Sequence, residues 1–272
     1  MRRRIALALL AAAAMPAYAD EPPAFVARPG LEWTATVAGG ALWLTTGSLI
    51  KPSIAPLDCR WCDTNGFDDW ASALRRDDPH AVDLTSDIIS YAVEPAAASG
   101  LVVLAAVQDH HPRDLSVDLL LVGESLVGAA LVGEALRFAT ARERPFVHDL
   151  PAEDKGSTAH PEENNLSFVS GHAATSWALA IASGEVASRR HRRLAPVVWA
   201  TGLTMATATS FFRVGSGEHY ASDVLGGAAL GIAVGLAVPY LHRARAGDRA
   251  VAASLAPVPG GGLVLVTFAE QR

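Results

Sequence analysis

The stretch Arg213-Val-Gly-Ser-Gly-Glu-His219-Tyr-Ala-Ser-Asp223 lies between two uncharged runs, residues 194–212 and 224–241. Both runs are nearly long enough to span a bilayer as helices. If the chain becomes helical near His219, the i, i+4 spacing places His219 and Asp223 on one face. A carboxylate bound to one ring nitrogen leaves the other nitrogen free as a nucleophile or base. Arg213 adds a guanidinium fork that suits an oxyanion such as phosphate. The stretch therefore predicts a polar site between two apolar helices.

The composition agrees with a fold built from such helices. Of the 272 residues, 50% are hydrophobic and only 18% are charged. An ordinary soluble domain has fewer apolar and more charged residues. We therefore predict an all-α fold, a helical bundle that is either embedded in a membrane or tightly packed. The formal net charge of −6 does not favour nucleic-acid binding.

The first 19 residues have the pattern of a secretory signal peptide. Three arginines at 2–4 precede an apolar run at 5–14, and a small-x-small cleavage pattern ends at Ala19. An uncleaved first membrane helix is the alternative, which the short apolar run disfavours. We expect residues 1–19 to be a signal peptide and the protein to be exported.

Export gives a meaning to the two cysteines, Cys59 and Cys62. In an oxidising compartment, such a pair favours a local disulfide. A zinc site would need two further ligands, and the sequence has no second cysteine pair. A redox C-x-x-C motif is the other alternative, but no thioredoxin-like pattern surrounds it. We therefore expect a structural disulfide.

The mature chain divides into three parts. Residues 20–83 hold a proline-containing leader, an uncharged helix at 33–50 and the cysteine loop. Residues 84–242 form a helical domain. Residues 243–272 form a tail with a small C-terminal β-hairpin. The strands of this hairpin are expected at 251–256 and 263–268.

The helical domain consists of apolar segments separated by polar turns. Expected helices cover 84–107, 115–142, 173–187, 194–212 and 224–241, with a polar loop at 146–167 that has the length of a lid or binding loop. Glu94-Pro95 interrupts the first helix, because proline kinks a helix interior. Asp118, Glu124 and Glu134 do not share one face of the second helix, so that helix cannot be wholly exposed to lipid.

Two further pieces could complete an anion site. Arg137 and Arg144 are two helical turns apart, so both can project from one face. Taken alone, they could equally be two arginines that snorkel at a helix end. Ser170, Gly171 and His172 stand where the polar loop meets a helix. Ser170 suits an N-cap, and the free N–H groups of a helix start bind phosphate well.

Together the pieces form an ordered pattern of three motifs. They are Arg137-x6-Arg144-Pro145, Ser170-Gly171-His172 and Arg213-x5-His219-x3-Asp223. The pattern resembles that of the type 2 phosphatidic acid phosphatase superfamily, K-x6-RP, PSGH and SR-x5-H-x3-D. That superfamily also includes bacterial class A acid phosphatases and vanadium haloperoxidases. The chain departs from it at Arg137, Val169 and Phe212, which replace lysine, proline and serine. The resemblance implies a bundle of about six core helices.

The resemblance also implies a reaction. His219 would attack phosphorus and become a phospho-histidine, while Asp223 would hold its other ring nitrogen. His172 would protonate the leaving oxygen and then activate water. Arg137, Arg144, Arg213, Ser170 and Gly171 would bind the phosphoryl oxygens. No cofactor is implied, since arginines take the place of a metal ion. We expect a metal-independent phosphatase for phosphomonoesters or pyrophosphates, most of all lipid phosphates.

Two other functions remain open at this point. A vanadium-dependent haloperoxidase would place vanadate where phosphate binds, with His219 as its ligand. A non-catalytic envelope scaffold is the alternative from another class, and the complete set of catalytic residue types argues against it.

Basic residues predict the orientation of the site. Arginines gather at 189–193 and at 243–249, at the helix ends away from the motifs. If these ends are cytoplasmic, the motifs face the periplasm. A cleaved signal with six spans contradicts that arrangement. The conflict disappears if 33–50 lies on the membrane surface, if the signal stays uncleaved as a non-spanning leader, or if the whole protein is a soluble periplasmic bundle. We expect membrane association, a periplasm-facing site, and a phosphorylated lipid or small phosphoester as substrate.

Overall fold

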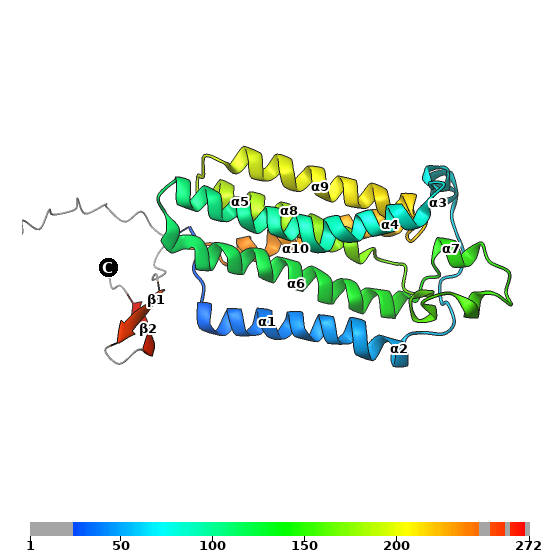
Figure 1. Cartoon of the computed structure of the whole chain (residues 1–272), viewed down its shortest axis with the longest axis horizontal. Coiled ribbons are helices and arrows are strands. Elements are labelled where there is room, and N and C mark those ends of the chain that lie inside the picture. The colour runs from blue at the N-terminus through cyan, green and yellow to red at the C-terminus, as the bar shows by residue number, and fades with distance from the viewer. Residues whose placement is uncertain (1–23, 245–250, 259–261, 270–272) are drawn as a thin grey trace, which may run out of the picture.

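The computed structural model describes residues 24–244, 251–258 and 262–269 and shows long helices that run side by side (Figure 1). The predicted signal peptide, residues 1–19, lies outside the described residues. The long helices are α1 (Pro29–Thr45), α4 (Pro79–Ile88), α5 (Glu94–Gln108), α6 (Leu115–Thr140), α8 (Gly171–Arg189), α9 (Ala195–Gly215) and α10 (Ala221–Leu241). The short helices are α2 (Lys51–Ile54), α3 (Gly66–Ala71) and α7 (Pro145–His148). Single turns of other helix types are η1 (Thr46–Ile50), η2 (Ser72–Leu74), η3 (Ile89–Val93), η4 (Pro112–Asp114), η5 (Lys155–Ser157) and η6 (Pro161–Glu163).

Helix α8 is the centre of the bundle and packs against α6, α9 and α10. Glycines on α10 allow this close approach. At Gly227 a Cβ would collide with the carbonyl oxygen of Ser170, and at Gly231 with that of Ala174. At Gly235 it would lie 2.8 Å from the Cβ of Ile181. Small residues therefore bring the backbones of α8 and α10 into contact.

The interruption expected at Glu94-Pro95 takes a specific form. Helices α4 and α5 join through the π-helical turn η3, which ends at Val93. A proline ring clashes with the carbonyl four residues earlier, and a wider turn relieves such a clash. The first helix begins at Pro79, five residues earlier than predicted, because Asp78 caps it by accepting the Ala81 N–H at 3.0 Å.

The acids of α6 have partners inside the bundle, as their scatter around the helix predicted. Asp118 accepts a hydrogen bond from Arg190 at 2.8 Å. Glu134 pairs with Arg137. Glu124 faces His242, at the end of α10.

Three segments of the described chain are long and apolar enough to cross a membrane. They are Pro79–Gln108, Pro112–Thr140 and Ala221–Leu241. They support a membrane location for the protein. Helix α9 is not among these segments, although the uncharged run predicted there, residues 194–212, is nearly long enough to span a bilayer. The threonines and serines of α9 lower its hydropathy. The predicted helix at 33–50 corresponds to α1 and η1.

The C-terminal hairpin is present at the expected place. Strand β1 (Val251–Val258) pairs with the antiparallel strand β2 (Gly262–Ala269). Val251 lies opposite Ala269, and Val258 opposite Gly262.

Candidate active site

The three sequence motifs meet at one end of the bundle, where α6 and α9 end and α8 and α10 begin. The short helices α2, α3 and α7 gather at this same end (Figure 1). Arg137 lies in the last turn of α6 and Arg213 in the last turn of α9. Arg144 precedes α7. The topology therefore brings together arginines that are far apart in sequence.

His219, the predicted nucleophile, is buried, with 2% of its surface exposed. Its Nδ1 lies 2.8 Å from the backbone carbonyl oxygen of Ser167. Since a carbonyl only accepts, Nδ1 carries the proton and Nε2 keeps a free lone pair. Burial, Arg144 and Arg213 hold the pKa of His219 well below its usual value. His219 is therefore neutral and has a free nitrogen, as a nucleophile requires.

The predicted direct bond between His219 and Asp223 is not present. His219 precedes α10, which begins at Ala221, so the two residues do not stack on one helical face. The Oδ2 atom of Asp223 lies 3.8 Å from Nδ1 of His219, which is too long for a hydrogen bond. It accepts instead from Ser167 Oγ at 2.6 Å and from the Tyr220 N–H at 2.9 Å. Asp223 thus positions His219 through Ser167.

His172 has a carboxylate partner that the sequence analysis missed. Its Nε2 lies 2.7 Å from Oδ1 of Asp87, on α4. Its ring packs against Tyr91, with 4.7 Å between the ring centroids. Burial and the nearby arginines, Arg213 first, hold the pKa of His172 well below its usual value. No spacing rule relates residues 87 and 172, so only the fold brings them together.

The start of α8 presents the backbone groups expected of an anion site. Ser170 is fully buried and caps the helix by accepting the Ala173 N–H at 3.4 Å. Its own N–H donates to the carbonyl of Asp223 at 3.0 Å. The position of a Cβ on Gly171 would be 3.5 Å from the guanidinium of Arg137, so Arg137 lies directly over the helix start. The first N–H groups of a helix have no acceptor within the helix. Here they lie beside the guanidinium of Arg137, and both kinds of donor favour an anion.

Two glutamates hold the arginines together. Glu218 pairs with Arg144 and lies 3.5 Å from Arg213. Glu163 pairs with Arg144 at 2.7 Å and with Lys51 at 2.6 Å. Burial alone would raise the pKa of Glu163, but Arg144 and Lys51 hold it well below its usual range. Glu163 therefore remains ionised, and both glutamates occupy guanidinium donors that could bind phosphate.

Arg213 and Arg144 are anchored differently. Arg213 pairs with Asp83 and donates a hydrogen bond to Oγ of Ser86 at 3.0 Å. For Arg144, burial lowers the pKa, but Glu218 and Glu163 outweigh it, so the pKa is raised and the charge is secure. Both side chains are almost fully buried. Burial lowers the effective dielectric constant around the two guanidinium groups and so strengthens their attraction to an anion.

Arg142 is a functional residue that the sequence analysis missed. It is fully buried, and its guanidinium lies between the rings of Trp61 and Tyr220, at 3.9 Å and 4.1 Å from their centroids. It binds Asp223 at 2.5 Å and Asp68, on α3, at 2.7 Å. Its place within the first motif, between Arg137 and Arg144, is the only signal that could have pointed to it. Arg142 therefore fixes the carboxylate that positions His219.

The cysteine loop holds Trp61 against Arg142. Cys59 and Cys62 form a disulfide with 5.4 Å between their Cα atoms. Within this loop, the Arg60 N–H donates to the Ala141 carbonyl at 2.9 Å. The Trp61 carbonyl accepts the Glu143 N–H at 3.1 Å. The loop is therefore attached to the backbone on both sides of Arg142.

A comparison with protein-family models matches the part of the chain that contains the three motifs. The PAP2 superfamily model matches residues 118–246. This segment of the chain, residues 118–246, belongs to the PAP2 superfamily. All three motifs lie within the matched segment, as does Arg142. Lys51, Asp68 and Asp87 come from the chain before it, so this PAP2 site uses residues from outside the family segment.

Among solved structures, the chain is similar to one of a PAP2 protein. It is the first transmembrane PAP2-type phosphatidylglycerolphosphate phosphatase from Bacillus subtilis, at 16% sequence identity and a TM-score of 0.45. The similarity covers 79% of this chain and 95% of that one. No curated protein sequence matches the chain significantly.

Proposed function

We propose that this PAP2 protein is a metal-independent phosphatase that hydrolyses lipid phosphates through a phospho-histidine at His219. One observation carries the proposal. His219 is buried and neutral, its Nε2 is free, and its pKa is lowered by burial and by the same arginines that would bind phosphate. Membership in the PAP2 superfamily supports a phosphatase.

In the first step, the Nε2 lone pair of His219 attacks phosphorus, and the bond from phosphorus to the leaving oxygen breaks. His172 is neutral before substrate binds, so it first takes up a proton when the bound phosphate dianion offsets the charge of the arginines, and it then donates this proton to the leaving oxygen. In the second step, neutral His172 takes a proton from water, the water oxygen attacks phosphorus, and the N–P bond breaks. Inorganic phosphate and free His219 result. Asp87 orients His172 in both steps.

The arginines stabilise the charge on the phosphoryl oxygens. Arg137, Arg144 and Arg213 would share them with the N–H groups at the start of α8. The phosphoryl group would replace Glu218 on Arg144 and Arg213, because a dianion competes well for bidentate guanidinium donors. Three fixed cations supply the charge that a metal ion supplies in other phosphoryl transfers, and this is the basis for metal independence.

The phosphatase domain would extend over residues 84–242, with an exported chain and a periplasm-facing site. Helix α8 runs from the site to the arginines at 189–193, and α10 runs from the site to Arg243. Basic residues favour the cytoplasmic side, so this polarity supports a site on the opposite side. The Cys59–Cys62 disulfide at the site end supports an oxidising compartment.

A phosphorylated lipid is the proposed substrate. The segment Pro79–Gln108 carries Asp87, and the segment Ala221–Leu241 carries Asp223. Side chains of the site therefore stand on segments that are apolar enough to lie in a membrane. A lipid headgroup held at the membrane surface could reach such a site without leaving the bilayer.

The test is phosphate release by the purified full-length protein in the presence of a chelator. Phosphatidate, a lipid pyrophosphate and a small aryl phosphate would be compared, with His219→Asn as the inactive variant. His148→Asn is the matched control, because His148 lies on α7 at the same end with its side chain 40% exposed. We expect release from a lipid phosphate, a loss of at least about 10³-fold in His219→Asn, and no change in His148→Asn.

Trapping the intermediate would test the mechanism separately. A phosphorylated protein that is acid-labile and absent in His219→Asn would support it. Full turnover by His219→Asn would refute the phospho-histidine. No release from any substrate, together with bromide oxidation after addition of vanadate and peroxide, would show a haloperoxidase.

A further inference from the structure

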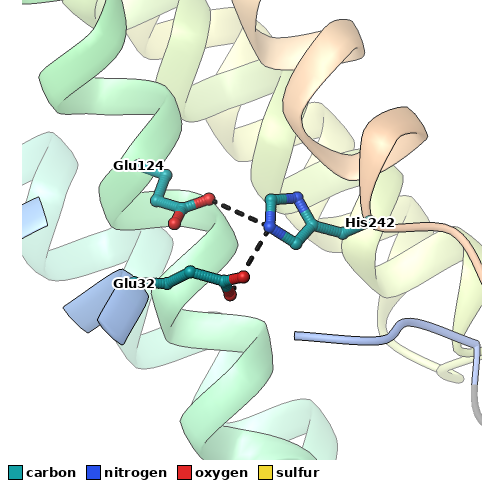
Figure 2. Close-up of side chains that lie close together, drawn as sticks. All are labelled: Glu32, Glu124 and His242. Atoms are coloured by element: carbon teal, nitrogen blue, oxygen red, sulfur yellow. Dashed lines mark ion pairs between the residues drawn. The ribbon is translucent and has the colours of Figure 1, made fainter. Parts of the chain in front are cut away.

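Three potential metal ligands converge at the end of the bundle away from the phosphatase site. They are Glu32 in the first turn of α1, Glu124 on α6 and His242 at the end of α10. Figure 2 shows the two carboxylates pointing toward one ring nitrogen of His242 from neighbouring helices. The ligand atoms all lie within 4.8 Å of one another, and the three side chains are half-buried. None of these residues has a role in the proposed reaction.

The spacing of these atoms differs from that of a hydrogen-bonded cluster. Nε2 of His242 lies 3.6 Å from Oε2 of Glu32 and 3.5 Å from Oε2 of Glu124. Both distances exceed those of hydrogen bonds, about 2.7–3.2 Å. Tetrahedral Zn²⁺, with ligands at about 2.0–2.1 Å, separates its ligand atoms by about 3.4 Å. The gaps therefore have the size that a coordinated ion requires.

The imidazole is already in the state that a metal ligand needs. Nδ1 of His242 lies 2.9 Å from the carbonyl oxygen of Val238, so this nitrogen carries the proton. In this tautomer Nε2, the nitrogen that faces the two glutamates, is the one available to a metal ion. Metal-binding histidines commonly donate the other N–H to a carbonyl in this way, which fixes the ring and its tautomer. Glu32 is held too, since its Oε2 accepts the Arg28 N–H at 2.9 Å.

The charge of the cluster also calls for a cation. Two carboxylates share one imidazole, and Glu124 lies in an apolar segment long enough to cross a membrane. Within residues 24–244, no lysine or arginine forms an ion pair with Glu32 or Glu124. Partly buried carboxylates without a cation are unfavourable in an apolar region. A divalent ion would balance both.

We propose that Glu32, Glu124 and His242 bind one Zn²⁺ ion, with water as the fourth ligand. One nitrogen and two carboxylate ligands suit zinc, whereas Mg²⁺ and Ca²⁺ prefer oxygen ligands in larger number. The site would tie α1 to α6 and α10, and thus join a helix outside the PAP2 match to two inside it. Helix α10 has 21 residues, so its ends lie about 30 Å apart, and the ion takes no part in catalysis.

The test is zinc binding by the full-length protein in detergent after chelation and gel filtration. We expect one Zn²⁺ per chain, a rise in Tm of about 5 °C on adding it, and loss of both effects in Glu124→Gln and His242→Asn. Two control variants should keep both. Glu185→Gln removes a carboxylate that pairs with Arg189 at the end of α8, and His111→Ala removes an exposed histidine.

Two further measurements keep the outcome clear. Co²⁺ in the unaltered protein should give the absorption spectrum of four-coordinate cobalt, which does not depend on whether the variants fold. Phosphate release should be the same with and without zinc, since the site is remote from His219. Zinc binding that persists in Glu124→Gln and His242→Asn, or binding of Mg²⁺ or Ca²⁺ but not Zn²⁺, would overturn the proposal.

Discussion

Replacing Arg142 with methionine tests whether the buried guanidinium positions His219 through Asp223. The change leaves two carboxylates, Asp68 and Asp223, that have no exposed side-chain surface and have lost their cation. Removing one partner of a buried ion pair costs about 3–5 kcal/mol. The cation–π contacts with Trp61 and Tyr220 contribute about 1–2 kcal/mol more, and methionine recovers part of this by packing between the rings. We expect a net loss of about 4 kcal/mol in the free energy of unfolding.

The assay combines denaturant unfolding with phosphate release by the fraction that remains folded. Because Asp223 acts on His219 only through Ser167, we expect kcat to fall by about 10–100-fold while KM stays within about twofold. Asp68→Asn in the same chain should restore part of the stability, since it removes one of the two unpaired charges. A coupling energy of about 1–3 kcal/mol between the two changes is expected.

Arg142→Lys is the matched control, because it keeps the charge and loses the planar fork. It should lose less stability than Arg142→Met and recover part of kcat. If Arg142→Met unfolds at the same denaturant concentration as the unaltered protein and keeps its kcat within twofold, then Arg142 does not position Asp223 and the reasoning is wrong.

Three other predictions concern the same end of the bundle. Glu218→Gln removes the carboxylate that bridges Arg144 and Arg213, so inorganic phosphate should inhibit about 10-fold more strongly; unchanged inhibition would show that phosphate does not bind there. Replacing both Cys59 and Cys62 with serine opens a very short loop and should lower the free energy of unfolding by about 2 kcal/mol. It should also lower kcat, because Trp61 would leave Arg142. Thermal unfolding and turnover measure the two effects, and an unaltered kcat would show that the loop does not support the site. The pKa values of His172 and His219 lie well below their usual 6.5, so the unfolded chain binds protons that the folded protein does not, and stability should fall as pH drops below about 6.5. Tm measured from pH 7.5 to 5 should show this decline, and a smaller one in His219→Asn.

The sequence predicts most of the fold because apolar runs and their breaks are local signals. The π-helical turn before Pro95 and the hairpin at 251–269 follow from proline geometry and from β-prone residues around a turn. The spacing of Arg137 and Arg144 predicted that both project from one face of a single helix, and this was wrong, because α6 ends at Thr140 and Arg144 lies in extended backbone before α7.

The support around the site could not be predicted in this way. Asp87 and Arg142 acquire their roles from contacts between distant segments, and no spacing encodes such contacts. The direct bond expected between His219 and Asp223 was wrong because the helix starts two residues after His219. A difference of half a turn in the helix start changes the partner of the imidazole from a side chain to the carbonyl of Ser167.

The glycine face of α10 has an evolutionary consequence. At Gly227 and Gly231 the backbone of α10 lies against the carbonyl oxygens of Ser170 and Ala174, and the Ser170 N–H is bonded to the Asp223 carbonyl. Any larger residue on this face would drive the two helices apart and widen the gap between the phosphate-binding turn and the support of His219. Residues in the contact between α8 and α10 can therefore change little when selection favours a new substrate. Variation in specificity among descendants of this protein should accumulate instead in residues 151–160, which are mostly exposed and lie in the loop before α8.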